Sequence, residues 1–304
     1  MKRRNHSVMM ANAVHHIYQN TPKGYLIFYS FQDYLVFYSI VSAVARRFDV
    51  QILGICLMID HVHLVVYVRD PDQLRGFIRY YTSLFTIKYN NWYGRKGSVF
   101  NTPFGCVPKP GHKKTRTAIA YLYNNPVECH LFDRTEEARW NFLAYAAEKS
   151  PFSEKLRMDR VRWELRKALE QVKDSAKRSI PLEYAMLERI TKNLSFKELQ
   201  QFIDYTVRLY NFIDYQALIR YYGSYDDLVT AVNSNTGNEY DIKEDTFAKD
   251  HRIYGKMITR LCGGKERTMK EILAMPYAER QRLGRSLSYN PGASQKEIQK
   301  LLRL

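Results

Sequence analysis

The chain has 304 residues, and its 47 Lys and Arg against 31 Asp and Glu give a formal charge of +16. With 45% hydrophobic and 26% charged residues, the composition is that of a folded protein of one or two domains, and it excludes a collagen-like, disulfide-scaffold or wholly disordered chain. The excess of positive charge indicates a polyanionic partner, most often nucleic acid, although a basic surface kept for solubility gives the same count.

The first part of the chain, residues 1–150, predicts an alternation of strands and helices. The strand-like segments are 13–19, 25–29, 51–58, 61–68 and 104–107, and the helix-like segments are 33–48, 72–89 and 115–124. Because only Ile59 and Asp60 separate two of the strands, these two strands are expected to form a hairpin or a bulged antiparallel pair. The order of elements predicts an α+β fold of the ferredoxin-like kind, an antiparallel sheet with helices packed on its face.

The second part, residues 151–304, predicts helices almost throughout, with the boundary at Ser150-Pro151. Helices are expected at 155–177, 182–192, 196–210, 215–222, 250–262, 268–273, 277–288 and 295–304, with a polar loop at 233–245. This part is the expected DNA-binding domain, and residues 268–304 are candidates for a partial helix-turn-helix. Either an upstream helix enters a DNA groove or the last helix, capped by Ser294 and Glu297, only packs.

Cysteines and apolar runs indicate the compartment. Cys56, Cys106, Cys129 and Cys262 are far apart and form no C-x-x-C pair, which argues against a zinc ribbon or a disulfide framework. The most apolar run, 34–45, is too short to span a bilayer. The basic start of the chain is not followed by an apolar segment, so no secretory signal is predicted. We therefore expect a cytoplasmic protein without membrane contact.

His61-Val62-His63 lies inside the strand predicted at 61–68. Because side chains alternate along a strand, His61 and His63 share one face and can bind one metal ion. The same pattern fits two histidines facing solvent on a half-exposed sheet. A nucleotide hydrolase of the histidine-triad type would need a third alternating histidine where this chain has Val65, so the sequence disfavours that class.

A second polar cluster follows at residues 121–127. Residues four apart share a helical face, so Tyr121 and Asn125 are expected to be neighbours while Tyr123 points away. Pro126 is expected to end the helix, which would leave the Asn125 amide able to turn toward a metal. A helical tyrosine is more often a packing residue than a nucleophile, so its position alone assigns no role to Tyr121.

Together the two segments resemble the signature motifs of the single-tyrosine HUH transposases, and within that superfamily most closely the REP-associated tyrosine transposases. Residues 58–66 carry the His-x-His motif, and about sixty residues later 121–127 carry Tyr-x-x-x-Asn-Pro. Segments 97–101 and 140–145 are similar to further motifs of the family, so the resemblance covers about 13–150. Where the family commonly has Pro-Asn before the first histidine, this chain has Ile59-Asp60.

The resemblance implies an enzyme that cuts and rejoins single-stranded or hairpin DNA through a covalent 5′-phosphotyrosine, as a transposase of a mobile or repeated element. It implies Tyr121 as the nucleophile, His61 and His63 as metal ligands, Asn125 as the third ligand, and Mg²⁺ or Mn²⁺ as the ion. The chemistry is consistent, because one divalent ion can polarise a phosphodiester and stabilise its leaving oxygen. A phenol with a pKa of about 10 needs such help to act as a nucleophile.

The implied partner is DNA, and a homodimer is left open. The candidate nucleic-acid-binding residues before the tyrosine are Lys109, Lys113, Lys114 and Arg116, which a solvated surface would also explain. Two further classes stay open at this point: a non-catalytic nucleic-acid-binding protein with the same fold, and an HUH replication or transfer initiator.

Overall fold

The structure is a computed structural model that describes residues 9–234, 251–263, 267–288 and 292–304. The strands are β1 (Ala13–Asn20), β2 (Val50–Leu57), β3 (His61–Val68) and β4 (Gly105–Pro108). The helices of the first part are α1 (Phe31–Ala45), α2 (Pro71–Tyr93) and α3 (His112–Glu128), with short 3-10 turns at η1 (Pro22–Gly24), η2 (Thr135–Glu137), η3 (Arg139–Asn141) and η4 (Leu143–Ala146). The remaining helices are α4 (Trp163–Lys177), α5 (Tyr184–Thr191), α6 (Phe196–Leu209), α7 (Tyr215–Arg220), α8 (Tyr225–Asn233), α9 (Arg252–Cys262), α10 (Met269–Ala274), α11 (Tyr277–Leu287) and α12 (Gln295–Leu302).

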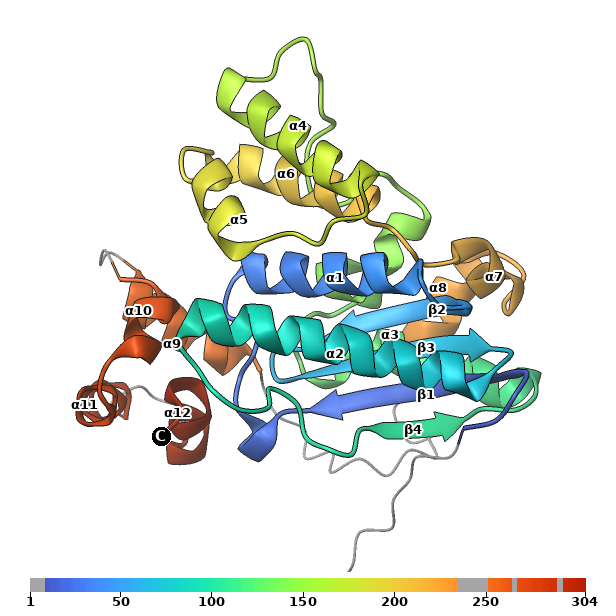
Figure 1. The fold of residues 1–304 in the computed structure, drawn as a ribbon, viewed down its shortest axis with the longest axis horizontal. Helices are drawn as coiled ribbons and strands as arrows, with labels where there is room; N and C mark the ends of the chain where they lie inside the picture. Colours follow the sequence, from blue (N-terminus) through green and yellow to red (C-terminus); the bar gives the residue numbers. More distant parts are fainter. Residues whose placement is uncertain (1–8, 235–250, 264–266, 289–291) are drawn as a thin grey trace, which may run out of the picture.

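The strands form one antiparallel sheet in the order β2-β3-β1-β4 (Figure 1). Combined with the chain order of strands and helices, this is the ferredoxin-like arrangement that the sequence predicted. The expected hairpin of β2 and β3 is present, and its register shifts between Ile52 and Gly54 at a bulge. In the register of β1 and β3, Tyr18 lies opposite His63 and Asn20 lies opposite His61.

The two faces of the sheet bury different sets of residues. Ile17, Leu64 and Val66 belong to the core that packs under α1 and α2. Alternate residues of the same strands, such as Val14 and Val65, pack against α3, α7 and α8 on the other face. The histidines of β3 have the same alternation as Val65, so they face α3.

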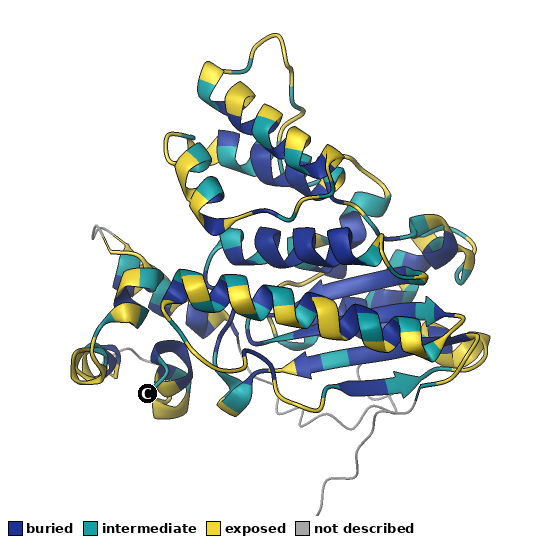
Figure 2. Ribbon diagram, in the orientation of Figure 1, coloured by how far each residue is buried: buried dark blue, intermediate teal, exposed yellow. Residues whose placement is uncertain are grey.

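Helix α1 is enclosed on nearly every side (Figure 2). The sequence placed apolar residues on one face of this helix, but Val36, Phe37 and Ile40 on its other faces are buried as well. The cause is tertiary: α1 packs against α2 and the sheet on one side and against α5 and α6 on the other. A helix that is apolar all round is a buried helix.

The helical part of the chain surrounds the sheet domain instead of standing apart from it (Figure 1). One buried cluster runs from the sheet through α1 and α2 into α4–α6 and α9–α12, while α7 and α8 join the cluster around α3. Among the described residues, no helix combines the length and apolarity needed to cross a membrane.

Several predicted boundaries were wrong. Tyr25–Tyr29 is not a strand, because its backbone makes only two bonds to the neighbouring turn, from Ile27 and Phe28 to the Ile59 carbonyl. Helix α2 continues to Tyr93, into the segment expected to be a connection. Helix α8 was not predicted, and most of the loop expected at 233–245 lies outside the described residues.

Pro126 does not end α3, which continues to Glu128. The fixed φ of proline is itself helical, and the one hydrogen bond that it removes falls in the last turn, where the loss is smallest. The turn is closed instead by the Cys129 N–H, which donates to the Asn125 carbonyl, and by the Leu131 N–H, which donates to the Pro126 carbonyl. Asn125 therefore lies within the helix, not at its terminus.

Candidate active site

The site lies between β3 and α3. The ring centroids of His61 and His63 are 4.9 Å apart, and the His63 and Tyr121 rings meet edge to face at 5.5 Å. The Oδ1 atom of Asn125 is 3.3 Å from Nε2 of His61. The structure thus brings together all four residues that the motifs singled out for chemistry.

The two-residue spacing of the histidines in β3 matches the four-residue spacing of Tyr121 and Asn125 in α3, because α3 runs antiparallel to β3. Two residues along a strand advance by about 6.6 Å, and four residues along a helix advance by about 6 Å. Tyr121 is therefore level with His63, and Asn125 is level with His61. The predicted helical register is confirmed on its other face, where the Tyr123 hydroxyl donates to the Leu53 carbonyl at 3.3 Å, away from the histidines.

Asp60 orients the first histidine. Its Oδ1 is 2.6 Å from Nδ1 of His61, so Nδ1–H donates to the carboxylate and Nε2 presents its lone pair toward Asn125. Burial alone would raise the pKa of Asp60, but the charge and hydrogen bond of His61 hold it well below its usual range. His251 and Lys300, both from the helical part of the chain, lower it further. Such outer partners fix the tautomer of a metal-binding histidine.

His16 orients the second histidine, His63. Its Nε2 lies 3.0 Å from Nδ1 of His63, with the two rings stacked at 5.1 Å. Burial, and after it the charge of Lys109, lowers the pKa of His16 to about 3, so its ring is neutral. A neutral His16 accepts from Nδ1–H of His63 when Nε2 of His63 binds an ion. His16 was not among the site residues predicted from the sequence, although a polar side chain on an apolar strand was a usable signal.

The donor set fits a divalent ion. Within the described part of the chain, no group of three His, Cys, Asp or Glu side chains could hold a metal. The third donor here is an amide oxygen, from Asn125, which such a group does not include. Two imidazole nitrogens with their outer partners in place, and one amide oxygen, suit a borderline or hard divalent cation.

The predicted nucleic-acid-binding residues lie at and before the start of α3. Lys113, Lys114 and Arg116 are exposed on its first turns. Lys109 is half-buried on the connection from β4, and its charge reaches His16. Lys109 therefore belongs near the histidines, whereas the other three face outward.

A cavity of about 320 Å³ opens at the opposite end of α3. Its lining includes Tyr67, His112, Arg220 and Tyr221. Tyr67 is four residues along β3 from His63, so this cavity is separate from the histidine site.

The fold and the site define an antiparallel α+β domain in which a His-x-His strand lies under a Tyr-x-x-x-Asn helix. Residues 14–125 match the family model described as "Transposase IS200 like", and this stretch contains every residue of the site from His16 to Asn125. The match agrees with the resemblance seen in the motifs and covers only that part of the chain.

One solved structure, "Structure of the REP associates tyrosine transposase bound to a REP hairpin", is similar at 15% sequence identity and a TM-score of 0.36. The match covers 45% of this chain and 78% of that chain. Among curated proteins, none matches this chain.

Proposed function

We propose that the protein is a transposase that cuts and rejoins single-stranded or hairpin DNA, with Tyr121 as the nucleophile. The observation that supports this most strongly is the convergence of the Tyr121 ring, two oriented imidazoles and an amide oxygen between β3 and α3. The match of residues 14–125 to the IS200-like transposase family supports the same reaction class.

In the proposed reaction, Oη of Tyr121 attacks the phosphorus of a phosphodiester and its proton is released to water. The bond from phosphorus to the 3′-oxygen breaks, and that oxygen takes up a proton to leave as a hydroxyl. The 5′ side stays joined to Tyr121 as a phosphodiester, so a 3′-hydroxyl can later reverse the step and rejoin the strand. Because the bond energy is kept in the phosphotyrosine, no nucleotide cofactor is needed.

His61, His63 and Asn125 would hold the divalent ion, which when bound polarises the phosphate and stabilises the leaving oxygen. Asp60 and His16 keep the two Nε2 atoms directed at that position. Tyr121 is only 3% exposed, so the packing of α3 holds its ring in one place beside His63. Positioning of this kind lowers the barrier of a bimolecular step by fixing the reacting groups in advance.

The test is trapping of the covalent intermediate. The full chain is incubated with Mn²⁺ and a labelled DNA hairpin taken from the repeats that flank its gene, and the products are separated under denaturing conditions. We expect a protein–DNA adduct from the parent and none from Tyr121→Phe.

Tyr123→Phe is the matched control, since it also loses one hydroxyl from α3 but on the face away from the histidines. It should retain the adduct and lose about 1 kcal/mol of stability with the hydrogen bond to Leu53. An adduct from Tyr121→Phe would refute the assignment of the nucleophile, and DNA binding without an adduct from the parent would favour a non-catalytic binding protein.

A further inference from the structure

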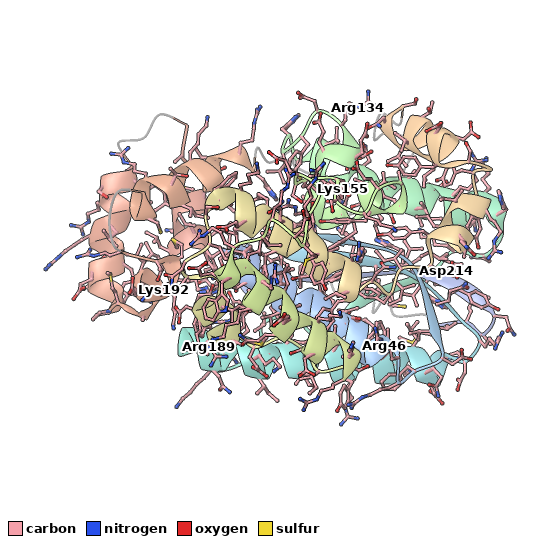
Figure 3. All side chains as sticks on the ribbon, turned by 90° about the horizontal axis from the view of Figure 1, so that it is seen from above. Arg46, Arg134, Lys155, Arg189, Lys192 and Asp214 are labelled. Atoms are coloured by element: carbon pink, nitrogen blue, oxygen red, sulfur yellow. The ribbon has the colours of Figure 1, made fainter. Side chains whose placement is uncertain are left out.

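Basic side chains alone do not locate a DNA-binding surface on this protein. In the view from above, the labelled Arg46, Arg134, Lys155, Arg189 and Lys192 are spread over the molecule (Figure 3). Where positive charges are balanced by nearby carboxylates, the local field is weak and a polyanion gains little. The net charge of each group of helices therefore indicates better than single basic residues where a polyanion would bind.

The two groups of helices differ sharply in this balance. Residues 151–234, which form α4–α8, contain 14 Lys and Arg against 12 Asp and Glu. Residues 251–304, which form α9–α12, contain 12 Lys and Arg against 4 Asp and Glu. Less than a fifth of the chain thus carries +8 of the +16 net charge.

The acidic residues described in α9–α12 are engaged at helix starts. Glu271 and Glu297 accept from the capping residues Thr268 and Ser294, and Glu279 lies in the first turn of α11. Carboxylates at these positions cap the backbone and complement the helix dipole. The described acidic residues of this region therefore stabilise helix starts. Lys300 is buried and Arg303 packs among Tyr29, Tyr89 and Tyr93, but most of the other described basic side chains are exposed.

Helix α9 presents the most regular part of this surface. Arg252, Lys256 and Arg260 are exposed and lie at i, i+4 and i+8, so they form one stripe about 12 Å long. The opposite face of α9 buries Ile253, Met257 and neighbouring residues in the core, and the helix has no acidic residue.

This stripe begins beside the candidate active site. The His251 N–H, just before α9, donates to the Cys129 carbonyl at the end of α3, at 3.2 Å. The Cys129 N–H in turn donates to the carbonyl of Asn125, whose Oδ1 is 3.3 Å from Nε2 of His61. DNA whose phosphate lies between His61 and Tyr121 would therefore have its flanking backbone within reach of Arg252.

We propose that the outer surface of α9–α12, led by the stripe of Arg252, Lys256 and Arg260, binds the sugar-phosphate backbone of the DNA that flanks the cleaved phosphate. The inference rests on the proposed function for its partner, and it assigns this task to α9–α12 and not to α4–α8. The helical part of the chain then has two roles, since α4–α6 bury α1 and α9–α12 bind DNA.

The experiment measures how binding of a labelled hairpin depends on salt, with the full chain carrying Tyr121→Phe so that no strand is cut. Lys256→Gln combined with Arg260→Gln should weaken binding at low salt. It should also lower the slope of log K against log salt by about 1.4 to 1.8, which corresponds to two lost phosphate contacts. Lys173→Gln combined with Lys177→Gln is the matched control, an exposed i, i+4 pair on α4, and should leave the slope unchanged.

An unchanged slope in the α9 variant, or an equal loss in the α4 variant, would overturn the proposal. The result does not depend on the chemistry, because binding is measured without cleavage. If the parent never forms an adduct while the α9 pair still lowers the slope, the proposed reaction fails and the assigned DNA surface remains. If the adduct forms and the slope does not respond, the reaction remains and the surface is wrong.

Discussion

The two faces of the sheet are built from the same strands but have opposite tasks. On β1, His15 and His16 are adjacent and both buried. His15 closes a local loop by bonding to Met10 and Ala13, whereas His16 on the other face bonds to His63. The face toward α1 and α2 is mostly apolar core, and the face toward α3 holds the polar groups that contact the candidate site residues. Changes on one face should therefore alter stability, and changes on the other should alter chemistry.

The largest effect is expected from the two histidines proposed as metal ligands. His61→Ala and His63→Ala should each lower the rate of adduct formation by roughly a thousandfold or more, since the ion supplies several kcal/mol of transition-state stabilisation. EDTA should do the same to the parent, with recovery on adding Mn²⁺. Rates are measured by single-turnover trapping of the adduct. Full activity in the presence of chelator would show that the reaction does not need a metal ion.

The next largest effect is expected from the apolar face of β3. Leu64 lies between His63 and Val65 in β3, but its side chain points to the opposite face of the sheet and is fully buried. Leu64→Ala should therefore lower the free energy of unfolding by about 2 to 5 kcal/mol. Below its melting temperature, the variant should still form the adduct. Urea unfolding and trapping on the same preparation check both parts, and a stable but inactive variant would show that the two faces are not separate.

Asp33, buried among α1, α2 and α5, should make stability depend on pH. Tyr93 and Tyr184 donate to its carboxylate, yet burial raises its pKa to about 6 from 3.8. Between these values the folded state binds the proton more tightly than the unfolded state, so stability falls as pH rises from about 4 to above 6.

The full difference is about 3 kcal/mol. Comparing the parent with Asp33→Asn by urea unfolding at pH 4 and pH 7 isolates this group, because other titrating residues cancel in the difference. The parent should lose stability relative to the variant as pH rises. A difference between the two proteins that does not change with pH would contradict the buried ionisation.

The smallest effect is expected from the histidine pair of β1. His16→Ala should lower metal affinity and adduct formation by about 10- to 100-fold, as loss of an outer partner of a ligand does. His15→Ala, whose ring bonds to the backbone of Met10 and Ala13 and faces away from His63, should leave both unchanged. Mn²⁺ titration without DNA provides a readout that is independent of cleavage, and equal effects of the two variants would mean that His16 is only a packing residue.

Much of the fold was predictable because strands and helices leave periods in the sequence. The two-residue period of 61–68 placed His61 and His63 on one face, and the four-residue spacing placed Tyr121 beside Asn125. The order of elements was enough for the ferredoxin-like sheet. The same local reasoning was wrong at Tyr25–Tyr29, since strand-like residues need a neighbouring strand to pair with, and at Pro126, where the surrounding packing keeps α3 helical.

What only the tertiary structure decided is which distant segments meet. The sequence by itself determined each half of the site, but the halves join because α3 crosses β3 antiparallel, so that a two-residue strand step equals a four-residue helix step. His16 reaches His63 through strand register, and His251 and Lys300 reach Asp60 because α9 and α12 pack against the sheet domain. Periodicity is local and survives in the sequence, whereas register and packing depend on the whole set of buried contacts, which no single segment records.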